Sequence, residues 1–169
     1  HGAISRVLEV PWGKSIKPNM VKEALEEDDF KAVTVTHVET STGVMNPIKD
    51  IGEIVEKHSD AFYIVDAVCS LGGIEVRVDD WNIDLCASGS QKCIGVPPGL
   101  ALLSVSDKAL KFQENRKSSM NSWYVDVRNW LPVMRDPSKY FATPPVNMIY
   151  ALSEALKALL SEGLEERFR

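Results

Sequence analysis

Three short polar segments carry the residues of this 169-residue chain that are best suited to do chemistry. They span residues 37–43, 65–73 and 88–99, and each one follows or ends an apolar stretch. Ligands of α/β proteins bind beside the carboxyl ends of the strands, which is where such segments begin. The three segments therefore predict a single ligand site, on condition that the strands before them are neighbours in one sheet.

One carboxylate, one lysine and a set of hydroxyls stand out in these segments. Asp66 ends the most apolar stretch of the chain, where an unpaired buried charge is costly, so its carboxylate needs a cation or a hydrogen-bond donor. Lys92 lies among glycine, serine and proline, which indicates that the backbone fixes its position, as a nucleophilic amine requires. With the hydroxyls of residues 40–42, these groups suit pyridoxal phosphate: the acid for the ring nitrogen, the amine for the aldehyde, and the hydroxyls for the phosphate and the phenolate.

Each of these residues also has a purely structural interpretation. The hydroxyls of residues 40–42 could cap a turn, Asp66 could cap a helix, and Lys92 could be a surface lysine. Residue types alone leave the two interpretations open.

The stretches around the three segments have the composition of an α/β fold. Short β-branched or apolar runs, typical of strands, occur at residues 7–10, 31–36, 62–65, 83–88 and 100–104. The continuous apolar run at 62–65 predicts a strand that is covered on both faces. Alternation with helical stretches predicts a predominantly parallel sheet with flanking helices, in which the later strands close antiparallel.

Three helical stretches are expected between and after these strands. One covers about residues 19–28, and a second covers residues 46–58, with Asn46 as its N-cap. Residues 111–132 are mixed in composition and predict a loop-rich crossing segment. From residue 144 onward a long amphipathic helix is expected, with an apolar stripe formed by Met148, Leu152, Leu156 and Leu159.

Composition and charge disfavour several classes of function. The net charge is −5 and the basic residues are scattered, so no basic surface for nucleic acid or an anionic membrane is expected. No apolar run approaches the about 20 residues of a membrane span, and no glycine-rich nucleotide motif follows a strand. The acidic run at 26–29 is interpreted as a solvated helix end and not as a metal site. Three cysteines match no zinc or redox motif and predict buried, reduced thiols in a cytoplasmic protein: Cys69, Cys86 and Cys93.

Taken together, the three polar segments resemble a known enzyme family. Their patterns are His-x-Glu-Thr-Ser-Thr-Gly, Val-Asp-Ala-Val-x-Ser-Leu-Gly-Gly, and Ser-Gly-Ser-Gln-Lys followed by Pro-Pro-Gly. In this order and spacing they are similar to the class V pyridoxal-phosphate aminotransferases of the alanine–glyoxylate / serine–pyruvate type. The resemblance implies a fold-type I enzyme, with residues 1–143 as part of the large cofactor-binding domain and residues 144–169 as a helix leading toward a small C-terminal domain. Members of the family are much longer, so we expect this chain to be a fragment.

By matching positions, the resemblance assigns the groups around pyridoxal 5′-phosphate. Lys92 would form the internal aldimine and act as general base, and Asp66 would pair with the pyridine nitrogen. Val68 would pack against the ring face, and Thr40 would reach the phenolic oxygen. Gln91 would bind the phosphate.

The resemblance also implies a homodimer. Tyr140 and Thr143 match a pair that reaches the phosphate of the neighbouring subunit, although interface packing and an N-cap before Pro144 would explain them as well. The sequence lacks the family's glycine-rich phosphate loop, its ring-stacking aromatic residue and the arginine that binds the substrate carboxylate. Three arginines do not sit in a matching context for the last role: Arg128, Arg135 and Arg167.

The reaction implied by the resemblance is a transamination. It moves the amino group of a small amino acid, alanine or serine, to a 2-oxo acid such as glyoxylate or pyruvate. The 2-aminoethylphosphonate and phosphoserine aminotransferases remain alternatives, whereas cysteine desulfurases are disfavoured because a histidine precedes their lysine and Gln91 precedes Lys92 here. A chain that keeps the fold without turnover is the alternative from a different class.

Overall fold

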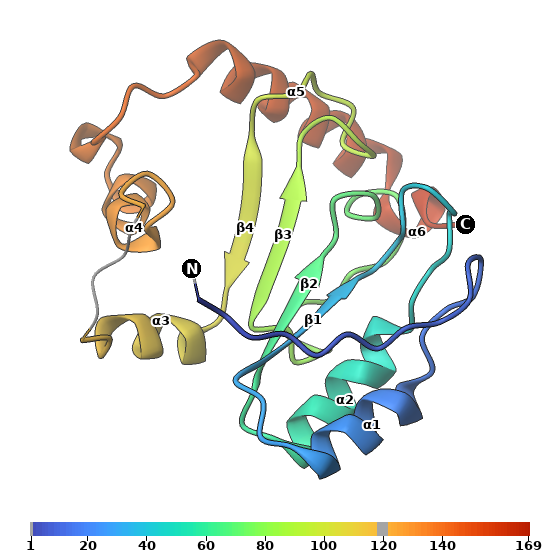
Figure 1. Cartoon of the computed structure of the whole chain (residues 1–169). Coiled ribbons are helices and arrows are strands. Elements are labelled where there is room, and N and C mark those ends of the chain that lie inside the picture. Colours follow the sequence, from blue (N-terminus) through green and yellow to red (C-terminus); the bar gives the residue numbers. More distant parts are fainter. Residues whose placement is uncertain (1, 118–121) are drawn as a thin grey trace.

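The computed structural model describes residues 2–117 and 122–169, and its centre is a four-stranded sheet (Figure 1). Its strands lie in the order in which they occur in the chain: β1 (Ala32–Thr36), β2 (Phe62–Asp66), β3 (Leu85–Gly89) and β4 (Ala101–Val105). β1, β2 and β3 are parallel, and β4 runs antiparallel to β3. The α/β class and the antiparallel closure are as predicted.

Two helices form a layer on one face of this sheet. α2 (Ile48–His58) packs on the strands, and α1 (Pro18–Glu27) packs on α2, close to the predicted bounds of both helices. Side chains alternate along a strand, so Tyr63 and Val65 of β2 both point into this layer and are fully buried. Because burying a large apolar side chain contributes about 1.5–3 kcal/mol, this layer holds together the strands that precede the polar segments.

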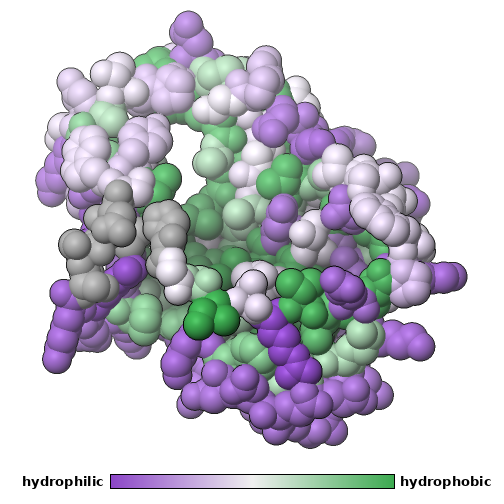
Figure 2. Space-filling view, in the orientation of Figure 1, coloured by the Kyte–Doolittle hydropathy of each residue, from purple (hydrophilic) through white to green (hydrophobic). Residues whose placement is uncertain are grey.

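The opposite face of the sheet is largely open among the described residues. Phe62 and Ile64 are only half-buried, and Leu103 of β4 is 52% exposed. Helix α3 (Asp107–Glu114) reaches one end of this face, where the rings of Phe112 and Phe62 meet at a centroid distance of 4.9 Å. Figure 2 shows hydrophobic surface exposed in the middle of the molecule. The prediction that the strand at 62–65 is covered on both faces is therefore wrong for this chain.

Two further helices replace the two ends of the loop that was predicted for residues 111–132. α3 begins after Ser106, whose hydroxyl accepts from the amide of Ala109. α4 (Val127–Arg135) begins after Asp126, whose carboxylate accepts from the amide of Arg128, and a 3-10 helix, η1 (Pro137–Lys139), follows it. Residues 118–121 of the predicted loop lie outside the described residues. The N-caps Ser106 and Asp126 are the local signals that the loop prediction overlooked.

The long helix predicted from residue 144 is α5 (Val146–Glu162), and a short α6 (Leu164–Arg167) follows it. Leu159 is buried, and Met148 and Leu152 pack with it against Ile94 and Val96 of the lysine-bearing segment. Leu156, the fourth member of the predicted stripe, is 39% exposed. No helix among the described residues is long and apolar enough to cross a bilayer.

Two other local predictions are wrong. Residues 7–10 form no strand, although Leu8 packs against the core without any ladder hydrogen bonds. Asn46 does not cap α2, since Pro47 occupies the cap position. Instead, the Asn46 side chain accepts from the Ile16 amide at 3.0 Å and donates to the Thr36 carbonyl at 2.8 Å, which ties the N-terminal segment to the end of β1.

Candidate functional site

The three polar segments leave the sheet at one edge, the one formed by the carboxyl ends of the parallel strands. Within the parallel strands, Asp66 pairs with Thr36 of β1 and with Ala87 of β3. The backbone ladder continues beyond the strands, because the His37 amide donates to the Asp66 carbonyl and the Ala67 amide donates to the Ala87 carbonyl, both at 2.8 Å. The condition stated for a single ligand site is therefore met: the carboxyl ends of β1, β2 and β3 are neighbours.

Asp66 lies at this edge with its carboxylate exposed to solvent. Its Oδ1 accepts from the Val68 amide at 2.9 Å, and no hydrogen bond to Oδ2 is formed by any described residue. The expectation of a buried acid is thus wrong for this chain, because the open face of the sheet leaves the end of β2 in water. No helix follows Asp66, which excludes a helix cap, and one carboxylate oxygen is left for a ligand.

The segment after β1 is a tight turn that presents Thr40. The amide and hydroxyl of Ser41 donate to Glu39 Oε1 at 3.0 and 2.9 Å, and these bonds lower the pKa of that carboxyl. The Thr42 hydroxyl accepts from the Val44 amide at 3.3 Å. Ser41 and Thr42 therefore stabilise the turn, as the structural interpretation had it. The Thr40 hydroxyl is directed elsewhere: its Oγ1 lies 3.0 Å from Cys69 Sγ, in the segment that follows Asp66.

The backbone around Lys92 is held by hydrogen bonds, whereas the lysine side chain is exposed. The buried Ser90 hydroxyl donates to the Pro97 carbonyl at 2.7 Å and accepts from the Leu100 amide at 3.3 Å. The Gly95 amide donates to the Lys92 carbonyl at 2.9 Å. No described residue forms an ion pair or a hydrogen bond with the Lys92 amine, so the amine is available for a ligand.

Gln91 lies back over Gly89, the last residue of β3. A Cβ built on Gly89 would lie 2.7 Å from Gln91 Oε1, closer than side-chain atoms approach one another, so this position of Gln91 depends on glycine at residue 89. The edge of the sheet thus offers an amide (Gln91), a hydroxyl (Thr40), a carboxylate (Asp66) and an amine (Lys92). Val68, which follows Asp66 by two residues, is half-buried. This donor set fits the groups of pyridoxal phosphate, and the individual roles stay predictions.

Tyr140 and Thr143 do not join this edge within the chain. Both are exposed, Tyr140 at 59%, and they lie on the segment between η1 and α5. In Figure 1 that segment lies beyond β4, the strand farthest from β1. Their contact with a phosphate in the neighbouring subunit stays a prediction.

The cysteines and one arginine depart from the sequence analysis. All three thiols are free, but only Cys86 is buried, and Cys69 and Cys93 are half-buried beside Thr40 and Lys92. Arg167, for which the sequence suggested no role, donates to carbonyls of the segments that follow Asp66 and Lys92. Separations of 74 and 95 residues give no local sequence signal for these contacts.

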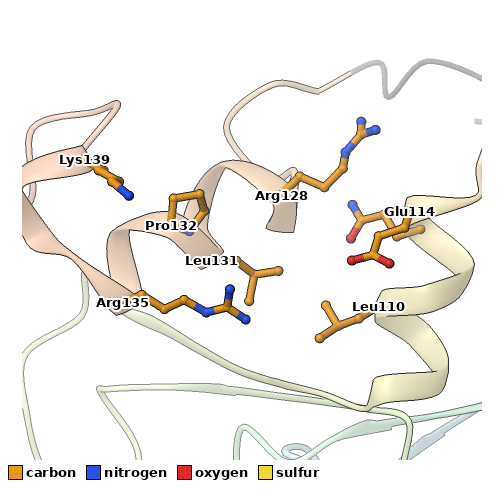
Figure 3. Close-up of a pocket in the computed structure, with 8 residues that line it drawn as sticks. Leu110, Glu114, Arg128, Leu131, Pro132, Arg135 and Lys139 are labelled. Atoms are coloured by element: carbon orange, nitrogen blue, oxygen red, sulfur yellow. The ribbon is translucent and has the colours of Figure 1, made fainter.

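A hollow of about 370 Å³ lies between α3 and α4, away from the polar segments. Figure 3 shows Arg128, Arg135 and Lys139 on its α4 side, facing Leu110 and Glu114 of α3. Arg128 is already paired with Asp126 at 2.6 Å, and this hydrogen-bonded pair lowers the pKa of the Asp126 carboxyl. None of the predicted site residues lines this hollow, so it is not the candidate site.

Comparison with known proteins extends the resemblance to almost the whole chain. Residues 1–167 match the family model of the class-V aminotransferases. An uncharacterized aminotransferase of Methanocaldococcus jannaschii is 47% identical over 163 residues, which cover 96% of this chain and 42% of that protein. Alanine–glyoxylate aminotransferase 1 of Saccharomyces cerevisiae is 37% identical over 92% of this chain and 42% of that protein.

A solved structure shows the same arrangement of elements. The crystal structure of an alanine–glyoxylate aminotransferase from Nostoc sp. matches with a TM-score of 0.91 and 34% identity, over 99% of this chain and 44% of that one. The chain therefore spans less than half the length of the relatives that it matches.

Proposed function

This chain belongs to the class-V aminotransferase family, and we propose that it forms the cofactor-binding core of a transaminase. Enzymes of this family use pyridoxal 5′-phosphate. The reaction would move the amino group of alanine or serine to glyoxylate or pyruvate, and the alanine–glyoxylate names of the yeast and Nostoc relatives support these substrates over phosphoserine or 2-aminoethylphosphonate. The observation that carries the proposal is the placement of Thr40, Asp66 and Lys92 at or just after the carboxyl ends of three adjacent parallel strands.

In such a reaction each residue of the edge would have a definite task. When bound, the cofactor would supply a ring that takes up the electrons released at the substrate Cα. Asp66 Oδ2 would hold a proton at the ring nitrogen, and the Lys92 amine would hold the aldehyde group and serve as the base for the proton at the substrate Cα. The Thr40 hydroxyl would donate to the phenolic oxygen, and the Gln91 amide would donate to the phosphate. Val68 would pack against the ring face.

A second copy of the chain would complete the phosphate site, with Tyr140 and Thr143 acting in trans. Their exposure and their place outside their own chain's site support this arrangement. Aromatic rings gather beside them: Phe141 lies 4.8 Å from the Trp123 ring and 4.7 Å from the Trp130 ring, between centroids. Such partly exposed aromatic clusters are enriched in subunit interfaces, so this segment suits a homodimer contact.

The remaining length of the whole protein would supply the phosphate loop, the ring-stacking aromatic residue and the carboxylate-binding arginine. In that arrangement residues 1–143 belong to the large domain, and residues 144–169 lead toward a small domain. The free thiols support a reducing, cytoplasmic setting.

Cofactor trapping tests the assignment of Lys92 directly. The chain is mixed with pyridoxal phosphate, reduced with borohydride and mapped by peptide mass spectrometry. We expect the label on Lys92, and we expect Lys92→Ala to lose it together with the visible absorbance of the bound cofactor. Lys139→Ala, which alters an exposed lysine outside the site, is the matched control and should be labelled normally.

Two outcomes would reject the proposal. A label spread over several surface lysines would mean that Lys92 has no special position. Absence of any bound cofactor, at concentrations that saturate family enzymes, would favour a chain that keeps the fold without turnover. With the whole protein, a donor screen over alanine, serine, phosphoserine and 2-aminoethylphosphonate separates the substrate alternatives.

A further inference from the structure

Arg167, the last residue of α6, contacts both segments that flank the predicted cofactor site. Its Nε donates to the Gly72 carbonyl, and its Nη2 donates to the Cys93 carbonyl at 2.8 Å. Its Nη1 pairs with Glu162 of α5 at 2.6 Å, and the side chain is only 26% exposed. Three groups that are distant in sequence thus meet at one guanidinium.

The two carbonyls belong to the segments that carry the proposed acid and amine. Gly72 lies in the second of two consecutive turns that follow Asp66: the Leu71 amide donates to the Ala67 carbonyl in the first, and the Gly73 amide donates to the Ser70 carbonyl in the second, both at 2.9 Å. Cys93 follows Lys92 in the chain. Whatever fixes the Gly72 carbonyl relative to the Cys93 carbonyl therefore fixes the acid-bearing segment relative to the lysine-bearing one.

The packing between these segments is close enough for such a link to matter. Cys93 Sγ donates to the Cys69 carbonyl at 3.4 Å, and a Cβ built on Gly73 would lie 2.6 Å from the same sulfur. A shift of a few tenths of an ångström would change these contacts. Both segments are loops, which are held by their hydrogen bonds and packing more than by a sheet ladder.

Arginine is suited to this task by its geometry. Its donors lie in one rigid plane and stay charged, so two carbonyls bound to Nε and Nη2 are held at a fixed separation. Hydrogen bonds from a charged donor are stronger than those from a neutral one. The pair with Glu162 sets the direction of the guanidinium and anchors it to the long helix α5.

We propose that Arg167 is a positioning residue that sets the spacing between the Asp66 and Lys92 segments. The inference rests on the proposed function for its purpose, but the link itself exists in the cofactor-free chain and is tested there. Arg167 touches neither the predicted cofactor groups nor their side chains, so it acts through Gly72 and Cys93.

Thiol modification in the cofactor-free chain measures the link. Iodoacetamide labelling with peptide mapping gives separate rates for Cys93, Cys69 and Cys86. Because a lost charge-assisted hydrogen bond is equivalent to about a tenfold change in an opening equilibrium, Arg167→Ala should raise the Cys93 rate about tenfold. Burial raises the pKa of the Cys86 thiol, so Cys86 should stay unreactive and report that the core is intact.

Matched variants separate positioning from general stability. Arg169→Ala removes the neighbouring arginine, which pairs with Glu166 at 2.9 Å, and should leave all thiol rates unchanged. Arg167→Lys should restore part of the protection, since an ammonium reaches one carbonyl but lacks the planar fork. Unchanged Cys93 rates in Arg167→Ala, or equal increases at Cys93 and Cys86, would overturn the inference.

Cofactor binding then tests what the link is for. Arg167→Ala should weaken pyridoxal-phosphate affinity about tenfold and shift the pH midpoint of the bound cofactor's visible absorbance, whereas Arg169→Ala should change neither. Faster Cys93 labelling with unchanged affinity and midpoint would refute the positioning role. Failure of the wild-type chain to label at Lys92 is a different result: it rejects the proposed function, and the thiol rates still decide whether Arg167 holds the segments.

Discussion

The carboxylate of Asp84 joins β2, β3 and α3 near the start of β3, at the other end of that strand from the candidate site. Its removal should destabilise the chain strongly. Asp84 is 6% exposed and immediately precedes β3. Its Oδ2 accepts from the Tyr63 amide of β2 at 3.0 Å and from Lys108 Nζ of α3 at 3.1 Å. Its Oδ1 accepts from the Ser106 hydroxyl, the N-cap of α3, at 2.7 Å. The predicted perturbation is Asp84→Ala.

The size of the effect follows from what each partner loses. An unsatisfied buried amide at Tyr63 costs about 1–3 kcal/mol, and loss of the bond to Ser106 costs about 1 kcal/mol. Lys108 is 44% exposed, so water replaces the carboxylate and the lost ion pair costs less than about 1 kcal/mol. We therefore expect Asp84→Ala to lower the free energy of unfolding by about 2–5 kcal/mol, out of the about 5–15 kcal/mol typical of a domain.

Urea unfolding followed by tryptophan fluorescence measures this loss. The midpoint should fall while the slope stays constant, because the folded and unfolded surfaces are unchanged. Asp80→Ala is the control, since Asp80 is exposed, pairs with Arg77 at 3.5 Å and should change stability by less than about 0.5 kcal/mol. A loss below about 1 kcal/mol for Asp84→Ala would show that the carboxylate does not join these elements in solution.

Three further predictions follow from the site and its surroundings. Burial lowers the pKa of His37, so just below pH 6.5 its imidazole takes up a proton in the unfolded chain but not in the folded one. The free energy of unfolding should therefore fall as the pH drops through this range, and it should fall less in His37→Leu. Gly89→Ala should displace Gln91 and weaken pyridoxal-phosphate affinity about tenfold, but should have little effect in a Gln91→Ala background. In the whole protein, mixing Lys92→Ala with Tyr140→Phe subunits should restore activity to about a quarter of wild type if Tyr140 acts in trans, because a random mixture forms about half hybrids with one intact site each. A mixture no more active than its parents would reject the trans contact.

Much of the fold was predictable because its signals are local. The short β-branched or apolar runs at β1 to β4 and the apolar faces of the helices are each visible within one element. Since parallel strands end at a common edge, the sequence alone was enough to assign the three polar segments to one site. The family resemblance depended on the same segments and has been confirmed.

The errors concern features that depend on distant parts of the chain. Residues 7–10 have strand composition, but a strand needs a partner edge, and here Leu8 is placed by packing alone. Asp66 was expected to be buried because its strand is apolar, yet its exposure depends on what covers the second face of the sheet. The role of Arg167 depends on carbonyls, which every residue carries, so no residue type marks its targets.

The open second face of the sheet also bears on how this chain behaves when it is concentrated. Ile64 and Leu103 lie on a surface bounded by β1 and β4, which are the edge strands of the sheet in the part of the chain that the structure describes, and such a surface promotes self-association. The net charge of −5 opposes this by mutual repulsion between molecules. That repulsion vanishes near the isoelectric point of about 5.2, so mild acidification should bring the chain out of solution before it unfolds the core.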